Sequence, residues 1–272
     1  MTDKAAVDLT GAAKTMLTTL YLKSLDAQFD EPVLGDTFAR DAVSRLDFDW
    51  SDLKVTAKWA PIVTVRTALY DMWAREFLAA HPEATVIHIG CGLDARVFRL
   101  DPGPEVRWFD CDFPDVIALR EQIYPTRPGY ELIKTSATDP SWLEKIPTDK
   151  PVLFLAEGIS MYLTQDEGTA LLRRVVDRFD SGEIQIDFYN WLAIKTQKMH
   201  MLNRRSGSTL HWAVNDPADV LDEVPGLRSV DDTTLFDAPT FDRVRGSFRT
   251  AGAVTRAMPA ARKSLQYHRF AF

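Results

Sequence analysis

The chain has 272 residues, of which 46% are hydrophobic and 26% charged, a composition typical of globular proteins. Its 39 acidic side chains outnumber its 32 basic ones, giving a net charge of −7, and no basic stripe is present, so we expect no nucleic-acid partner. No secretory signal or membrane-spanning apolar run is evident, and Cys91 and Cys111 show no metal-site spacing, so we expect a reduced, cytoplasmic chain with no membrane and no metal.

The first 80 residues have the patterns of helices. Apolar residues recur at helical spacing in 15–29, 36–46 and 61–80. Pro61 suits the first turn of the third segment, and Pro82 follows its end. We therefore predict an N-terminal helical segment over residues 1–80.

Strands and helices alternate from residue 84 to residue 190. Helices are predicted near 95–100, over 114–123 and behind a capping box at 164–167. This alternation is typical of a doubly wound, mostly parallel α/β sheet. The predicted strands cover 85–89, 106–109, 130–134, 151–156 and 183–189.

The rhythm stops after residue 190. We interpret 191–235 as a cap or lid insertion and 236–272 as a C-terminal helix followed by closing strands, with a helix over 237–251 and the last strand over 267–272. No linker or repeat divides the chain, so we expect a single domain over residues 1–272, with 84–190 as its ligand-binding core.

A glycine turn follows the first predicted strand. Gly90 and Gly92 stand between the strand and the next helix, an arrangement that lets a nucleotide approach the backbone and the free N–H groups of the helix. With Ala95, the spacing also satisfies the fingerprint of dinucleotide-binding folds. The turn therefore locates a nucleotide site without naming the nucleotide.

Acidic side chains follow the neighbouring strands. Asp112 lies about 20 residues past the glycine turn, where a carboxylate can hold ribose hydroxyls, and Asp110 competes for that role. Glu157 directly follows a wholly apolar strand and needs either a cationic ligand or a salt bridge, for example to Arg66 or Arg96. Ser136 follows the third strand.

The cap holds further candidates. His200 and His211 can serve as general bases, since histidine titrates near neutral pH, or can be ordinary exposed histidines. Large apolar residues of the same stretch either form an acceptor pocket or pack the cap: Trp191, Met199, Met201 and Trp212.

With these residues assembled, the chain resembles the leucine carboxyl methyltransferase family, and most closely its bacterial branch of polyketide O-methyltransferases. The matching segments are Arg66-Thr67 with Asp71, residues 89–96, Phe98-Arg99-Leu100, Asp112-Phe-Pro114, residues 156–163, and the surroundings of Lys23 and Asp36. The resemblance implies a class I, Rossmann-like methyltransferase sheet of seven strands that binds S-adenosylmethionine.

The resemblance also implies residue roles. Lys23 and Arg66 would approach the methionine carboxylate of the cofactor, and Glu157 would approach its methionine end. Tyr162 would lie near the acceptor and, with the two histidines, is a candidate catalytic residue. The remaining cofactor-binding candidates are Gly90, Gly92, Asp94, Asp112 and, at the adenine, Ser136 with Asp139 nearby.

The sequence thus predicts an S-adenosylmethionine-dependent O-methyltransferase. The methyl group would pass to a carboxylate, which needs no base, or to a hydroxyl of a small polyketide-like or other secondary metabolite. Three alternatives stay open: an NAD(P)-dependent oxidoreductase, a carboxyl methyltransferase acting on a protein C-terminus, and a non-catalytic cofactor-binding protein.

Overall fold

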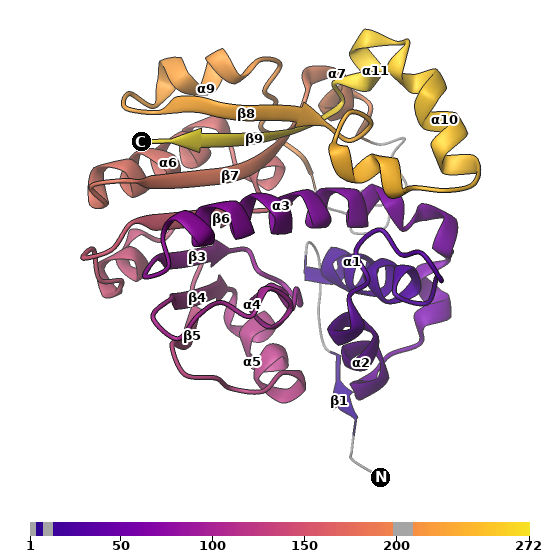
Figure 1. Ribbon diagram of the computed structural model, residues 1–272, viewed down its shortest axis with the longest axis horizontal. Helices are drawn as coiled ribbons and strands as arrows, with labels where there is room; N and C mark the ends of the chain where they lie inside the picture. Colours follow the sequence, from indigo (N-terminus) through magenta and orange to yellow (C-terminus); the bar gives the residue numbers. More distant parts are fainter. Residues whose placement is uncertain (1–3, 8–12, 198–208) are drawn as a thin grey trace.

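The computed structural model describes residues 4–7, 13–197 and 209–272, and a seven-stranded sheet runs through its centre (Figure 1). The strand order is β5-β4-β3-β6-β7-β9-β8. The first five strands of this order are parallel, whereas β9 runs antiparallel to both of its neighbours. The strands are β3 (Thr85–Ile89), β4 (Arg107–Asp112), β5 (Tyr130–Lys134), β6 (Val152–Ala156), β7 (Gly182–Tyr189), β8 (Arg228–Thr234) and β9 (Leu265–Ala271).

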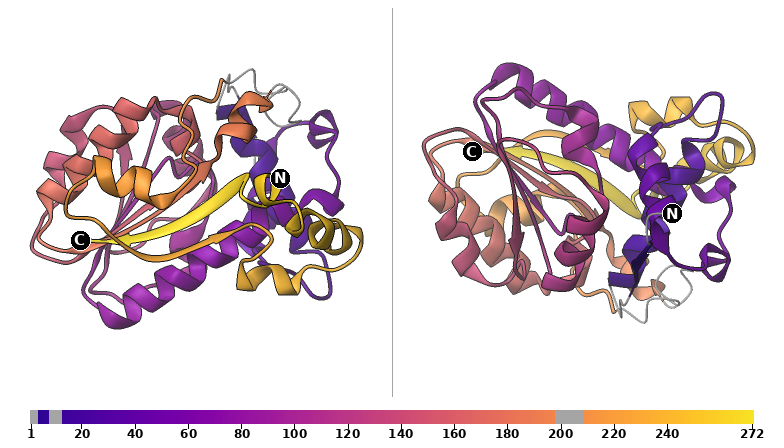
Figure 2. Two further views of the ribbon diagram at one scale, coloured as in Figure 1. Left: turned by 90° about the horizontal axis from the view of Figure 1, so that it is seen from above. Right: turned by 90° about the horizontal axis from the view of Figure 1, so that it is seen from below.

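Helices cover both faces of the sheet, as a doubly wound fold requires. On one face, α3 (Pro61–Ala80) and α4 (Arg96–Leu100) contribute to a core with β3 and β6, and α5 (Pro114–Ile123) reaches the same face through Arg120. On the other face, η3 (Pro140–Lys145), α6 (Gln165–Arg178) and α9 (Pro217–Glu223) form a second core. Figure 2 shows the sheet edge-on between these layers.

The central strands have the composition that burial on both faces demands. Every residue of β3 and β6 is buried, and β6 is entirely apolar. The predicted strands at 85–89 and 130–134 and the predicted helices at 61–80 and 114–123 match the structure at both ends. The predicted α/β fold is therefore confirmed.

The C-terminal part of the prediction needs correction. Residues 228–234, assigned to the cap, form the edge strand β8, whose residues are mostly exposed and polar, so no apolar alternation marks it. The predicted helix over 237–251 is η6 (Pro239–Arg243) followed by α10 (Ser247–Arg256). Residues 255–272 hold one strand, β9, preceded by α11 (Pro259–Arg262).

The N-terminal helices lie beyond the carboxyl ends of the parallel strands (Figures 1 and 2). A small apolar core joins α1 and α2 to Leu93 after the glycine turn and to Leu119 of α5. This contact holds α1 over the edge where a doubly wound sheet binds ligands. The segment comprises β1 (Ala5–Ala6), α1 (Ala13–Asp26), α2 (Thr37–Arg45), β2 (Leu46–Asp47), η1 (Trp50–Leu53) and η2 (Ala57–Trp59).

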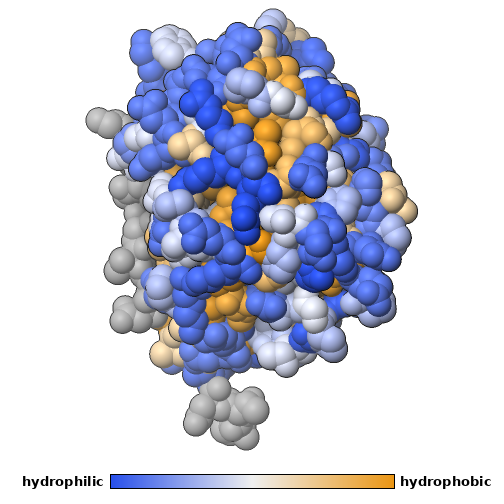
Figure 3. Space-filling view, turned by 90° about the vertical axis from the view of Figure 1, so that its left-hand side faces the viewer, coloured by the Kyte–Doolittle hydropathy of each residue, from blue (hydrophilic) through white to orange (hydrophobic). Residues whose placement is uncertain are grey.

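The opposite face of the molecule, at the amino ends of the parallel strands, is mainly hydrophilic, with hydrophobic residues showing between the polar ones (Figure 3). Within the described residues, no helix combines the length and the apolar character that crossing a membrane requires.

Candidate active site

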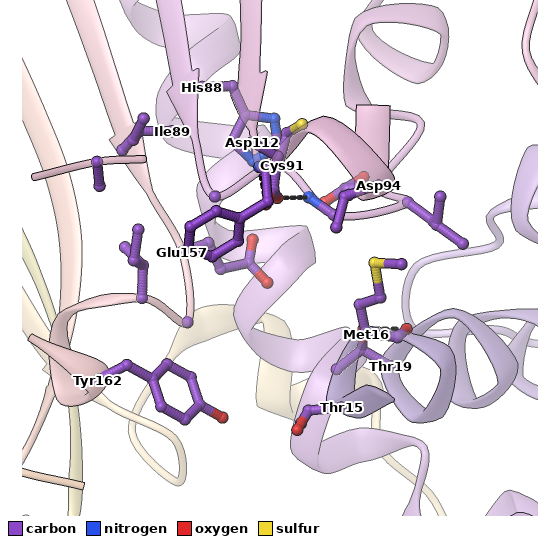
Figure 4. Close-up of a pocket in the computed structure, with 18 of the residues that line it drawn as sticks. Thr15, Met16, Thr19, His88, Ile89, Cys91, Asp94, Asp112, Glu157 and Tyr162 are labelled. Atoms are coloured by element: carbon purple, nitrogen blue, oxygen red, sulfur yellow. Dashed lines mark hydrogen bonds between the residues drawn. The ribbon is translucent and has the colours of Figure 1, made fainter. Parts of the chain in front are cut away.

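A cavity of about 370 Å³ opens at the carboxyl ends of the strands, a size within the range of small-molecule sites (Figure 4). It brings together candidates from α1, α3, four strand ends and η4 (Ser160–Tyr162). The sequence-predicted residues that line it are Lys23, Arg66, Gly90, Gly92, Asp94, Asp112, Ser136, Glu157 and Tyr162.

The glycine turn forms one wall of this cavity. Gly90 and Gly92 have φ values of 64° and 50°, which L side chains rarely adopt. A Cβ atom at Gly90 would lie 2.9 Å from Ile159 Cδ1, so a side chain there would collide with the opposite wall. The turn therefore requires glycine both for its backbone angle and for its close packing.

Arg120 of α5 binds the backbone of this turn from the protein interior. Its Nη1 atom donates to the carbonyl oxygens of Gly92 (2.9 Å) and Asp94 (2.8 Å). Its Nη2 atom pairs with Asp110, and the Arg120 side chain is fully buried. The backbone of the turn is thus fixed by a charged group that never reaches the cavity surface.

Asp112 and Asp110 have different environments although both belong to β4. Asp112 faces the cavity and accepts backbone N–H bonds from Gly92 (2.7 Å) and Phe113 (2.8 Å). Burial raises its pKa, against the effect of these two hydrogen bonds. Asp110 is buried among Arg120, Tyr130 and Trp108, away from the cavity lining. Of these two carboxylates, Asp112 is therefore the one that lines the cavity.

Glu157 is paired with both arginines that the sequence suggested. Its Oε1 atom accepts from Arg66 Nε at 3.0 Å, and its Oε2 atom accepts from Arg96 Nη2. Burial would raise the pKa of Glu157, but Arg96 and Arg66 outweigh that effect and hold it well below its ordinary value. The carboxylate still reaches the cavity surface, so it is both a salt-bridge partner and part of the site (Figure 4).

A second set of ion pairs continues from this one. Lys23 Nζ lies 2.9 Å from Asp94 Oδ2, and Arg99 contacts Asp94 on its other oxygen at 3.0 Å. Burial raises the pKa of Asp94, but Lys23 and the arginines more than compensate and hold it well below its usual range. The buried network includes Lys23, Asp36, Arg66, Asp71, Asp94, Arg96, Arg99, Glu157 and Asp187.

The far end of the cavity is lined by the segment that follows β5. The Ser136 hydroxyl lies 2.9 Å from that of Thr138, and both residues line the cavity. Asp139 is exposed instead and caps η3 by accepting from Ser141 N at 2.9 Å. Of the two residues suggested for this end, only Ser136 therefore reaches the cavity.

Comparisons with known proteins identify the chain. The family model described as leucine carboxyl methyltransferase matches residues 11–131. The chain is 38% identical to the tetracenomycin polyketide synthesis O-methyltransferase TcmP of Streptomyces glaucescens over 98% of both chains. The chain belongs to the leucine carboxyl methyltransferase family. It is an S-adenosylmethionine-dependent O-methyltransferase.

Further comparisons agree with this assignment. The S-adenosyl-L-methionine-dependent methyltransferase dpfgK of Gibberella zeae is 37% identical over 83% of each chain. Two solved structures share the fold at low identity. A DUF574 family protein of Streptomyces avermitilis has a TM-score of 0.62 at 12% identity and covers 96% of this chain and 97% of its own. For a Thermobifida fusca protein described as a putative methyltransferase, the TM-score is 0.57 at 13% identity, with 92% and 93% covered.

The lining of this methyltransferase fits S-adenosylmethionine. Arg66 uses only Nε and Nη1 in hydrogen bonds among the described residues, so donors remain for an anionic group. Asp112 has carboxylate lone pairs left for hydroxyl donors, and Phe113 beside it lines the cavity with half of its surface exposed. The chemistry of these groups suits the carboxylate, ribose and aromatic base of the cofactor.

Of the two catalytic candidates of this methyltransferase that lie within the described residues, one is found in the cavity lining. Tyr162 lines the cavity, and burial raises its pKa, an effect that Thr15 partly opposes (Figure 4). His211 does not line the cavity: its side chain is exposed, and its backbone N–H donates to Met161 O. His200 lies outside the described residues, as do Met199 and Met201.

Neither of the two cap tryptophans that the structure describes, Trp191 and Trp212, lines the cavity. Trp212 is buried against Phe188, with ring centroids 4.8 Å apart, and a Cβ atom on Gly168 would lie only 2.0 Å from it. Trp191 of α7 (Trp191–Lys195) is 52% exposed and is covered by Lys195. Both tryptophans therefore have packing or surface positions rather than positions in the cavity.

Sequence reasoning missed the wall that α1 supplies. The residues of α1 that face the cavity recur at helical spacing, a signal that the sequence carries but that core packing explains equally well. Glu167 caps the start of α6 and also lines the cavity, a position that the sequence did not predict. The missed lining residues of α1 are Thr15, Met16, Thr19 and Leu20.

Proposed function

We propose that this methyltransferase esterifies a carboxylate of a small, largely apolar molecule. Bound S-adenosylmethionine would supply an electrophilic methyl group on a sulfonium. The protein's part is to bind both partners, align the acceptor oxygen and exclude water, and alignment can be worth roughly 7–11 kcal/mol in favourable cases.

The observation that carries the proposal is the shortage of general bases around the cavity. Among the described lining residues, Glu157 is held between two arginines, Asp94 between Lys23 and Arg99, and Glu167 in a capping box, and all three have lowered pKa values. The ring nitrogens of His88 lie against Asp110 (3.3 Å) and Arg96 (3.5 Å), and Asp112 accepts two backbone N–H bonds, so both are engaged within the protein. Tyr162 has a raised pKa and so stays protonated, as a hydrogen-bond donor. A hydroxyl acceptor needs a base, whereas a carboxylate is already ionised near neutral pH.

The residue roles within this proposal follow the geometry. Lys23 and Arg66 would bind the methionine carboxylate, with Asp94 and Glu157 holding them in place. Gly90 and Gly92 would line the middle of the cofactor. Asp112 would bind the ribose hydroxyls and Ser136 the adenine edge, and Tyr162 would donate to the acceptor.

A small acceptor is favoured over a protein C-terminus by the relatives and by the lining. TcmP is named for polyketide synthesis, and its likeness to this chain extends over 98% of both chains. Apolar side chains that line the same cavity as Tyr162 suit a polyketide-like aromatic body: Met16, Leu20, Ile159 and Leu163. We also propose a reducing cytoplasmic setting, since Cys91 and Cys111 are both free and buried.

The test is methyl transfer from labelled S-adenosylmethionine to paired acceptors, such as anthraquinone-2-carboxylate and 2-hydroxyanthraquinone. The chemistry of the product separates the two classes, because mild base hydrolyses a methyl ester and leaves a methyl ether intact. We expect a base-labile product from aromatic carboxylates. Base-stable ethers as the main products across the panel would overturn the carboxylate assignment while leaving the family assignment intact.

A further inference from the structure

Asp187 is a charged residue in the interior of the sheet. It lies in β7 between Ile186 and Phe188 and is fully buried. Burying a carboxylate costs several kcal/mol unless its partners are well placed, and replacing such a pair by apolar residues often stabilises a protein. Its presence therefore calls for an account beyond stability.

Both partners of the Asp187 carboxylate, Arg66 and Gly158, line the cavity. Its Oδ2 atom lies 2.7 Å from Arg66 Nη1, and its Oδ1 atom accepts from Gly158 N at 2.6 Å. Its backbone carbonyl accepts from the Ser160 hydroxyl. One residue of β7 therefore holds α3 through Arg66 and the segment after β6 through Gly158 and Ser160.

These contacts fix the Arg66 side chain in one orientation. Its guanidinium is bound on Nε by Glu157 and on Nη1 by Asp187. No hydrogen bond among the described residues uses Nη2, although Arg66 lines the cavity and its side chain is only 11% exposed. The two carboxylates thus fix the guanidinium through Nε and Nη1 and leave Nη2 to donate to a third anion.

The same contacts fix the segment that carries Glu157 and Tyr162. Gly158 has a φ value of 75°, and a Cβ atom there would lie 3.2 Å from Arg66 Nη2, so the arginine packs directly on the turn. Ser160 begins the short helix η4, which ends at Tyr162. Displacing Asp187 would therefore disturb the turn and the guanidinium together.

We propose that Asp187 is a positioning residue that orients Arg66, against the turn at Gly158, toward the carboxylate of S-adenosylmethionine. This rests on the proposed role of Arg66. Asp187 itself has no place in the cavity lining, so it acts through Arg66 and Gly158 rather than on the ligand.

The decisive experiment compares two ligands that differ by one group. Affinities for S-adenosylmethionine and for decarboxylated S-adenosylmethionine are measured by isothermal titration on the wild type, Asp187→Asn, Arg66→Met and the double variant. A hydrogen bond to a charged group is worth about 1.5–3 kcal/mol, so we expect Asp187→Asn to weaken S-adenosylmethionine about tenfold or more. The decarboxylated ligand should lose less than about threefold, and Asp187→Asn should add little once Arg66 is replaced.

The matched control is Glu183→Gln, on the same strand. Glu183 also pairs with an arginine, Arg269, at 2.6 and 3.0 Å, but it lies outside the cavity lining. This substitution should leave both affinities within about twofold, because neither Glu183 nor its partner Arg269 lines the cavity. Should Asp187→Asn fail to fold, Asp187→Glu serves in its place, since it keeps the charge and displaces the carboxylate.

Two results would overturn the inference. Equal weakening of both ligands would show that Asp187 supports the fold of the site in general, and an unchanged affinity for S-adenosylmethionine would show that it orients nothing. A wild-type protein that binds both ligands equally would instead remove the role proposed for Arg66, which separates that failure from the failure of this inference.

Discussion

The backbone N–H of Gly92 donates a 2.7 Å hydrogen bond to Asp112 Oδ2, which joins the glycine turn after β3 to the end of β4. Two features that the sequence suggests separately, the turn and the acidic residue, are therefore one structural unit. The second oxygen of Asp112 is engaged by Phe113 N, so the carboxylate has a fixed plane against which ribose hydroxyls can bind.

Asp112→Ala removes both the ribose partner and the anchor of the turn. Loss of charge-assisted hydrogen bonds worth about 1.5–3 kcal/mol each predicts at least a tenfold weaker affinity for S-adenosylmethionine in isothermal titration. Asp115→Ala is the control, because Asp115 is exposed in the first turn of α5 outside the cavity lining. Equal affinities of the Asp112 variant and wild type would contradict the proposed ribose contact.

Glu157→Gln removes one carboxylate from between two buried arginines. We expect a loss of about 1.5–3 kcal/mol in the free energy of unfolding by urea at pH 7, since Arg66 and Arg96 each lose one of their carboxylate partners. The folded-state pKa of Glu157 is lowered, so its contribution is present above the ordinary carboxylate pKa and is lost as the pH falls through the folded value. Glu144→Gln, at an exposed position, should change the free energy of unfolding little. A Glu157→Gln variant as stable as that control would be inconsistent with the network as described.

Because of His268, we expect the stability of the protein to change with pH at higher pH values than the carboxylates would cause. It is buried beside Phe188 and Phe270, and burial lowers its pKa from 6.5 to about 4. The unfolded chain binds a proton between these values and the folded chain does not, so stability should fall by up to about 3 kcal/mol as the pH drops from 6.5 toward 4. The variant His268→Phe should flatten this part of the stability curve, and an unchanged slope would assign the dependence to other groups.

Gly168→Ala tests the packing of Trp212 against α6. Its Cβ atom would lie 2.0 Å from Trp212 Cζ3, so the indole must move out of a packed core. Overpacking of this kind typically costs about 1–3 kcal/mol, which thermal unfolding would show as a lowered Tm. Gly103→Ala is the matched control, because a Cβ atom there meets nothing within 4 Å. Similar Tm values for the two variants would mean that Trp212 is not fixed as described.

The sequence predicts the parallel core of this fold well because its signals are local. Wholly apolar runs, the glycine turn and first-turn prolines each mark a boundary within a few residues of themselves. The edge strand β8 escapes prediction because an exposed edge needs no apolar face. The motifs allow some of the cavity residues to be predicted, but they do not predict which of these residues form ion pairs with one another.

Arg66 and Asp187 illustrate why the pairing is hidden. They are 121 positions apart in the chain, and no spacing rule links them. The signal for Asp187 was present nonetheless, as an acidic residue directly between the apolar Ile186 and Phe188. A charge in such a strand indicates a buried partner, although it does not say which one. His211 lies outside the cavity lining because residue type alone does not determine where a side chain points.

Because α1 forms one wall of the cavity, the cavity needs a longer part of the chain than the sheet does. A chain shortened to start at Pro61 would keep α3 and every strand of the seven-stranded sheet. It would lose Lys23 together with α1, the helix whose Met16 packs against Gly92. We therefore expect shortening from the amino end to weaken cofactor binding before it removes the sheet.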